Sequence, residues 1–264
     1  MAQLVSLLGP GWIVATLLLA ARIAAVLLLT PVLHAVPIPP LVRVLAILGI
    51  ACLLAMPLVG TVAPTIHDTG ALLQAMVREV LVGATLGLGV LMGFAGFTLA
   101  GRLVDVQVGY GMAGVLDPLT RTHMPVLSSA FGLLAAVVFF LVDGHHALLR
   151  GLAYSLQRFP VGRSTDLASA GGPLAKELAA LFALGFALAA PVVLTLLLVD
   201  FALGVISRNL PQMNMLVMGI PVKIIVGLLA LSVWAGGFGA PAGRLYAQIY
   251  QAWTSWFSVE GARR

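Results

Sequence analysis

Charged residues are scarce in this sequence. Only 9% of its 264 residues are charged, whereas 61% are hydrophobic. Soluble domains have about a quarter charged and about half apolar residues. Nine acidic and fourteen basic side chains cannot cover a globular core of this size in water. The composition therefore excludes an ordinary soluble domain and indicates a membrane protein.

Metal-binding residues are also few. Cys52 is the single cysteine and lies in an apolar run, which excludes a disulfide framework and a cysteine-based metal site. His145 and His146 are adjacent, and neighbours on a helix point about 100° apart, so we expect that they cannot share one ion. We interpret them as a polar turn after a helix that stops at Asp143–Gly144, and we expect no metal site.

Motifs of enzymes and of nucleic-acid binding are missing. There is no G-x-S-x-G and no H-E-x-x-H. The glycine-rich stretch 83–101 lacks the spacing and the lysine of a phosphate loop, and its Gly83–Gly87 and Gly89–Gly93 pairs instead favour close helix packing. The basic residues are scattered rather than gathered with aromatic residues. We expect no catalytic residue, no cofactor and no nucleic-acid partner.

Long hydrophobic runs dominate the chain and predict an all-α membrane fold. Most are near the roughly 20 residues that span a bilayer. Lysine and arginine counts in the connections weakly favour cytoplasmic termini. The six predicted helical segments are 11–33, 41–60, 80–100, 126–142, 178–206 and 215–238.

A few charges interrupt these runs. Arg22, Asp200 and Lys223 lie inside segments, and Arg78 and Glu79 open the third one. A charge at the bilayer centre costs about 2.5–3.5 kcal/mol, so each should face protein, water or an opposite charge. For Arg78 and Glu79 we favour an ion pair or snorkelling. For Arg22 and Lys223 we favour a buried contact with another subunit.

The stretch "SRNLPQMNMLVMGIPVK", residues 207–223, separates the last two runs. Its two prolines remove backbone donors and predict a kinked hairpin tip whose freed carbonyls need polar partners. The alternative is a polar loop that only connects two helices. The candidate tip and contact residues are Arg208, Asn209, Pro211, Gln212, Asn214, Pro221 and Lys223.

A second unusual stretch, residues 106–116, is apolar yet broken by glycines. We expect a flexible loop, and a non-helical apolar loop at membrane depth needs protein or a cavity around it. This behaviour suits a plug or gasket; the alternative is a loop that only buttresses the third and fourth helices. The candidate plug residues are Val106, Val108, Gly109, Tyr110, Gly111, Met112, Gly114, Val115 and Leu116.

Taken together, several segments resemble the FliR family of flagellar type III export-gate proteins. The resemblance covers almost the whole chain in family order, and "PQMN" followed by "GIPVK" is its most specific part. The matching segments include "VPIPPLVRVLAI", "REVLVGATLGLG", "GRLVDVQVGYGMAGVLDP", "MPVLSSAFGLLAAVVFFLVDGHHALLRGLAYSLQRFPVG" and "SRNLPQMNMLVMGIPVKIIVGLLAL".

The resemblance implies a subunit that assembles with FliP and FliQ homologues in the inner membrane, at the flagellar basal body. Unfolded flagellar subunits would pass through the assembly, and an FlhB-like switch protein would bind near the hairpin tip. It also implies a FliP-like region at 1–156 that carries the plug loop, a polar connection at 157–177 and a FliQ-like hairpin at 178–243. The family position after "LAG" is often acidic but is Arg102 here, and Asp105 could take over its pairing with FliP.

Two alternatives remain open. The same architecture occurs in virulence injectisomes, although "DGHH" followed by "PVG" favours the flagellar branch. A small-molecule transporter should show inverted repeats with paired broken helices, and we find no such repeat.

The tail at 244–264 begins with an amphipathic pattern over residues 244–257. Leu245, Ile249, Trp253 and Phe257 recur every four residues. A helix rich in tryptophan and tyrosine suits a membrane interface or a partner groove. The alternative is a helix packed on its own chain.

Overall fold

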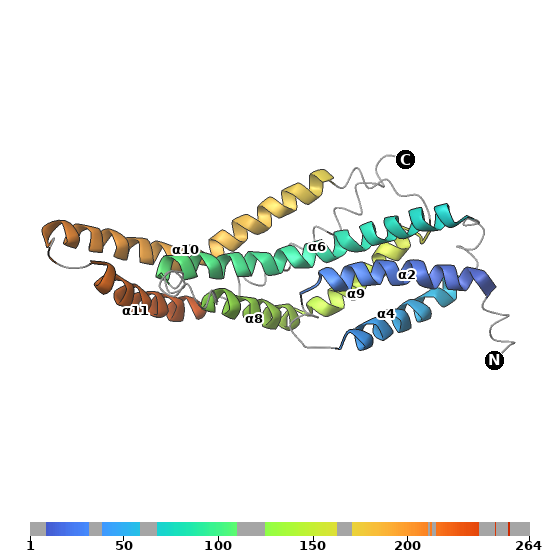
Figure 1. Cartoon of the computed structure of the whole chain (residues 1–264), viewed down its shortest axis with the longest axis horizontal. Helices are drawn as coiled ribbons and strands as arrows, with labels where there is room; N and C mark the ends of the chain where they lie inside the picture. The colour runs from blue at the N-terminus through green and yellow to red at the C-terminus, as the bar shows by residue number, and fades with distance from the viewer. Residues whose placement is uncertain are drawn as a thin grey trace, which may run out of the picture. The chain divides into compact units, whose positions relative to one another are not determined.

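The computed structural model describes residues 9–31, 39–58, 68–109, 125–162, 171–210, 212, 215–237, 246 and 253. Every regular element in these ranges is helical, which confirms the all-α prediction (Figure 1). The elements are α2 (Gly9–Leu29), α4 (Pro40–Ala55), η1 (Met56–Leu58), α6 (Thr69–Val108), α8 (Val126–Leu141), α9 (Gly144–Arg158), α10 (Gly171–Asn209) and α11 (Met215–Ala235).

Four helices within the described ranges are long and apolar enough to cross a membrane. They are α2, α6, α10 and α11, and the number rises to five if α8 and α9 count as one bent span. The hydropathy count of six segments is therefore higher than the number of helices in the described ranges that could cross a membrane. The α4 helix has 16 residues, which at 1.5 Å per residue is about 24 Å, shorter than the roughly 30 Å hydrocarbon core.

Two helices differ most from the hydropathy pattern. The α6 helix has 40 residues and begins at Thr69, eleven residues before the predicted start, because polar residues such as Gln74 and Arg78 are good helix formers. The α9 helix lies where we expected a polar turn. Its mixed composition hid it from a search for continuous apolar runs.

The chain divides into two compact units. Unit 1 comprises Met1–Leu91, Asp143–Lys176 and Ile249–Arg264. Unit 2 comprises Met92–Val142 and Glu177–Gln248. The helices α6 and α10 contribute residues to both. The division predicted from the resemblance, with boundaries at 156, 177 and 243, remains a prediction.

Unit 1 is built on α2, α4, α9 and the first part of α6. The α2 helix packs against α4 and against α6 through two glycines. A Cβ atom on Gly83 would overlap the carbonyl oxygen of Arg22, and one on Gly87 would lie 2.8 Å from the Cβ of Leu29. These close approaches confirm that the Gly83–Gly87 pair serves helix packing.

Unit 2 is built on α8, α11, the last part of α6 and most of α10. The α10 and α11 helices form a hairpin (Figure 1). Pro191 lies inside α10, where it removes one backbone donor and bends the helix. An aromatic cluster of Phe94, Phe97, Phe139 and Tyr246 fills part of the interior, with ring centroids 5.6–6.1 Å apart.

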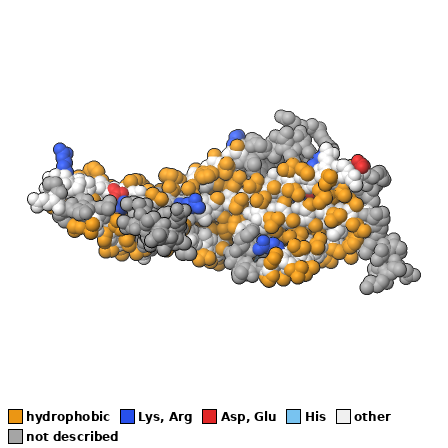
Figure 2. Space-filling view, viewed as in Figure 1, with side chains coloured by type: hydrophobic (Ala, Val, Ile, Leu, Met, Phe, Trp, Pro, Cys, Tyr) orange, Lys and Arg blue, Asp and Glu red, His pale blue; other side chains and the backbone are white. Residues whose placement is uncertain are grey.

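Much of the described surface is apolar. Only 28% of the most apolar window of α10 and 11% of that of α11 are buried. Hydrophobic side chains cover much of the face shown in Figure 2, and charged ones are sparse. Exposed apolar surface on this scale requires lipid or other protein subunits as its environment.

Candidate functional site: charged groups between the helices

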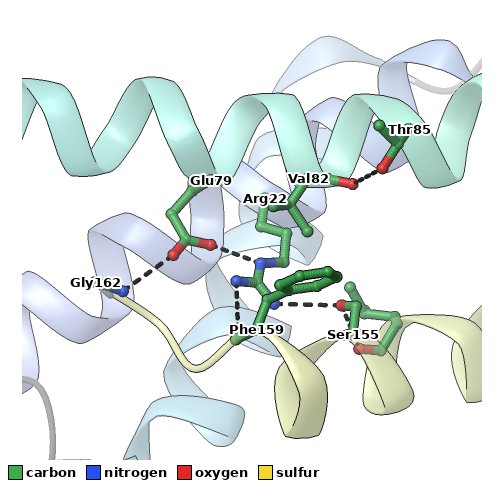
Figure 3. Close-up of polar contacts among 8 residues, drawn as sticks. Arg22, Glu79, Val82, Thr85, Ser155, Phe159 and Gly162 are labelled. Atoms are coloured by element: carbon green, nitrogen blue, oxygen red, sulfur yellow. Dashed lines mark hydrogen bonds and ion pairs between the residues drawn. The ribbon is translucent and has the colours of Figure 1, made fainter. Parts of the chain in front are cut away.

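Arg22 is the centre of a polar cluster inside unit 1. Its side chain is 1% exposed, and all three guanidinium nitrogens donate hydrogen bonds (Figure 3). Nε binds Glu79 Oε2 at 2.6 Å, Nη1 binds Ser155 Oγ at 3.3 Å, and Nη2 binds the carbonyl oxygen of Phe159 at 2.9 Å. A buried cation is stable only when it is paired and hydrogen-bonded in this way.

The partners of Arg22 are themselves satisfied. The second carboxylate oxygen of Glu79 accepts a hydrogen bond from the backbone nitrogen of Gly162 at 3.1 Å. The Ser155 hydroxyl donates to the carbonyl oxygen of Leu152 at 2.7 Å while it accepts from Arg22. The ion pair thus joins α2 to α6, and hydrogen bonds connect it to the end of α9 and the residues that follow.

This geometry gives no support to the prediction that Arg22 contacts another subunit. Its donors are all directed to groups of the same chain, and almost none of its surface remains accessible. The ion-pair interpretation of Glu79 is confirmed, and its partner is Arg22. Ser155, Phe159 and Gly162 were not recognised as partners, although buried Leu148, Leu152 and Ser155 share one face of α9 at helical spacing.

A second charged group lies inside unit 2. Lys223 on α11 binds both carboxylate oxygens of Asp200 on α10, at 2.8 and 2.9 Å. Gln107 near the end of α6 donates to Asp200 Oδ2 at 3.0 Å. The side chain of Lys223 is 19% exposed and that of Asp200 is 39% exposed. The ion pair gives Lys223 a partner within the chain, and its contact with another subunit stays a prediction.

Beside this ion pair lies a cavity of about 450 Å³. Its lining includes Asp200 and Lys223, together with Val108 and Gly109 from the end of α6 and Ser207 from α10. The polar group is therefore reachable at one edge of an otherwise apolar helix assembly.

The carboxylate of Asp105 caps the start of α8 from another helix. It is 4% exposed and accepts hydrogen bonds from the backbone nitrogens of Leu127 at 3.0 Å and Ser128 at 2.8 Å. A carboxylate at a helix N-terminus satisfies free donors and complements the helix dipole. Asp105 is therefore engaged inside the chain and almost fully buried, and this geometry gives no support to the hypothesis that it pairs with FliP in place of an acid at the exposed position of Arg102.

The structure places the first part of the predicted plug loop on a helix. Val106 and Val108 belong to the last turn of α6, with Val106 73% exposed and Val108 1% exposed. Gly109 ends the helix with a φ of 96°, a conformation open to glycine. The loop thus starts three residues later than expected. The remaining candidates, Tyr110, Gly111, Met112, Gly114, Val115 and Leu116, lie outside the described residues.

The predicted hairpin tip is shorter than residues 207–223. The α10 helix includes Arg208 and ends at Asn209, and α11 begins at Met215, so Pro221 and Lys223 lie inside α11. The exposed Asn209 amide donates to the carbonyl oxygen of Val205 at 2.9 Å, within the last turn of α10. Gln212 is exposed in the turn, and Pro211 and Asn214 lie outside the described residues.

The tail is described at two positions, and both are buried. In unit 2, Tyr246 is 1% exposed and its hydroxyl donates to the carbonyl oxygen of Ala135 at 2.8 Å. In unit 1, Trp253 is 3% exposed, and its ring packs against Gly151 of α9. These positions favour a tail packed on its own chain and overturn the membrane-interface interpretation for Trp253.

The start of α9 corrects the expectation for the two adjacent histidines. One potential ligand atom each from Asp143, His145 and His146 lies within 4.8 Å of the others. The argument that these histidines diverge too far to meet one ion is wrong, because side-chain rotation brings the two rings to a centroid distance of 4.1 Å.

Long apolar helices, charges paired between them and broad apolar surfaces define the chain as a helical membrane protein built for assembly. Residues 13–249 match the sequence profile of the bacterial export proteins, family 1. The chain belongs to this family.

Curated relatives agree with this assignment. The chain is 33% identical to flagellar biosynthetic protein FliR of Bacillus subtilis (strain 168), covering 83% of this chain and 85% of that protein. It is 28% identical to flagellar biosynthetic protein FliR of Escherichia coli (strain K12), over 80% of this chain and 88% of that protein. It is also 29% identical to Yop proteins translocation protein T of Yersinia pestis, over 70% of this chain and 73% of that protein.

Proposed function

We propose that this chain is a FliR-type core subunit of the flagellar type III export gate. In this role it forms, with FliP and FliQ homologues, the pore through which unfolded flagellar subunits pass. The observation that carries the proposal is family membership over residues 13–249, together with flagellar relatives along most of the chain. The site of action is the inner membrane, within the flagellar basal body. The role is structural and conductive rather than catalytic.

The surface of the chain supports assembly with other membrane subunits. Buried charges are paired within the chain, at Arg22 with Glu79 and at Lys223 with Asp200. The exposed faces of α10 and α11 are mainly apolar. Helix packing and small residues rather than exposed charges would then hold FliP and FliQ homologues. An FlhB-like switch protein would bind near the turn between these two helices, where Arg208, Asn209 and Gln212 are exposed.

Co-purification tests this assembly. We expect a tagged chain, co-expressed with the FliP and FliQ homologues of its own genome, to elute with both in one detergent-solubilised complex. The matched control omits only the FliP homologue, and the chain should then aggregate or be degraded. A chain that purifies as the same stable monomer with or without its partners would contradict the proposal.

An injectisome subunit is the second candidate. The similarity to Yop proteins translocation protein T favours it, at 29% identity over 70% of this chain. The flagellar relative from Bacillus subtilis matches a larger share of this chain, 83%, at a higher identity, 33%. The gene for this chain can be introduced into two deletion strains, one that lacks its flagellar homologue and one that lacks its injectisome homologue. Restored flagellar export in the first strain, without restored effector export in the second, would support the flagellar role.

Residues 110–116 are proposed to form the seal of the closed gate. A hydrophobic constriction excludes water and ions by dewetting, so apolar bulk matters more than any single side chain. Val108 is buried in α6, so a deletion that spares the helix must begin after Gly109.

Deleting residues 110–114 is expected to make cells that express the whole gate leaky to small ions, while the gate still assembles. Replacing the same five residues with glycine and serine keeps the length and removes the apolar character, and it should leak too. Membrane conductance and complex recovery are the two measurements. Cells that assemble the gate and stay as tight as wild type would show that the loop is only a buttress.

A further inference from the structure

We propose that Asp143, His145 and His146 form a binding site for a divalent transition-metal ion of the zinc class at the start of α9. This site is separate from the proposed export function. It consists of two imidazoles and one carboxylate within four consecutive residues of unit 1, and the ion would tie the beginning of α9 to the residue that precedes it.

The three side chains already converge. One potential ligand atom from each lies within 4.8 Å of the other two, and His146 Nδ1 is 3.2 Å from Asp143 Oδ1. The ligands of a tetrahedral zinc ion, each about 2.0–2.2 Å from the metal, stand about 3.3–3.6 Å apart. Small side-chain rotations therefore suffice to close the site, without movement of the backbone.

The backbone beneath the cluster is held in place. Asp143 adopts a left-handed conformation, with φ 55° and ψ 34°, which aspartate tolerates better than most residues. Its carbonyl oxygen accepts the hydrogen bond of Ala147 at 3.1 Å. Gly144 and Leu148 are buried and anchor the first turn of α9. A site on such a fixed element is preorganised for its ligand.

The ligand set selects the class of ion. Imidazole nitrogens suit zinc, nickel and copper, whereas calcium and magnesium prefer oxygen ligands throughout. Three protein ligands leave a fourth position for water. The side chains of His146 and Asp143 are 59% and 73% exposed, so they lie at the surface of the chain, where an ion can reach them.

A cobalt titration tests the proposal. The full chain, purified in detergent through a tag that contains no histidine and then treated with a chelator, is titrated with Co²⁺ and afterwards with Zn²⁺. We expect one equivalent of Co²⁺ to bind with visible absorption and Zn²⁺ to displace it. Loss of a side chain that only orients a metal ligand costs about 10–100-fold in affinity. Asp143 and His146 would be ligands themselves, so Asp143→Asn and His146→Gln should each weaken binding by more than about tenfold.

Two controls make the result decisive. His123→Gln removes a histidine outside the cluster and should leave the titration unchanged. Asn, like Asp, tolerates the left-handed backbone, so circular dichroism of Asp143→Asn should show an unchanged helix content. The proposal is overturned if wild type shows no saturable binding of one equivalent, or if Asp143→Asn and His146→Gln bind as tightly as wild type. In either case the pair is only an aspartate–histidine hydrogen bond.

Discussion

Replacing Glu79 with glutamine is expected to lower the free energy of unfolding by about 3–5 kcal/mol, because it removes one partner of a buried ion pair. Arg22 is 1% exposed and would keep its charge in the interior without a counter-charge. A glutamine has only one side-chain oxygen. If that oxygen accepts the hydrogen bond from the backbone nitrogen of Gly162, the amide NH2 group faces Arg22, which then has no acceptor there. The thermal transition of the purified chain in detergent measures the loss.

A neighbouring substitution provides the control for Glu79. Arg78 is one residue away on α6 and only partly buried, so Arg78→Gln should change stability little. The double variant Arg22→Met with Glu79→Leu should recover part of the loss, because it removes both charges together. If Glu79→Gln unfolds at the wild-type temperature, the charge of Glu79 is not needed to stabilise buried Arg22, and this prediction is wrong.

Trp253→Ala is expected to lower the free energy of unfolding by a similar amount, about 3–5 kcal/mol, because removing a large side chain that is only 3% exposed leaves a cavity. The ring is packed so closely that a Cβ atom on Gly151 would lie 3.0 Å from it. The loss of stability should appear as a lower temperature of the thermal transition, while the fraction of the chain found in membranes stays the same.

Leu149 on α9 is 56% exposed and gives a matched control for Trp253. Leu149→Ala should stay within about 0.5 kcal/mol of wild type. If Trp253→Ala instead leaves the thermal transition unchanged and releases the chain from membranes, the tail is a membrane anchor and its packing on unit 1 is not what matters.

Hydropathy predicted the helical class and the approximate position of most helices. It missed α9, because a helix with one buried face has no continuous apolar run. The pattern of Leu148, Leu152 and Ser155 at helical spacing could have revealed it. Hydropathy also overestimated the number of membrane-spanning helices, because the length of an apolar run alone does not show that α4 ends at Ala55 and passes into η1.

The cost of buried charge predicted which residues needed partners, but not which partners they have. Glu79 and Gly162 are 83 positions apart in sequence, and Arg22 lies 137 positions from Phe159. No local pattern encodes such contacts. Asp105 illustrates the same limit, since its role as a cap depends on where α8 begins. Partners of this kind follow only from the packing of helices that are distant in sequence.

Secretion of flagellar subunits tests the central claim most directly. In a strain of the source bacterium from which this gene alone has been deleted, the amount of flagellin and hook protein in the medium is compared with and without the gene on a plasmid. We predict that secretion is lost in the deletion and restored by the wild-type gene, but not by the Glu79→Gln variant if that chain fails to accumulate. Normal secretion of both proteins by the deletion strain would contradict the account.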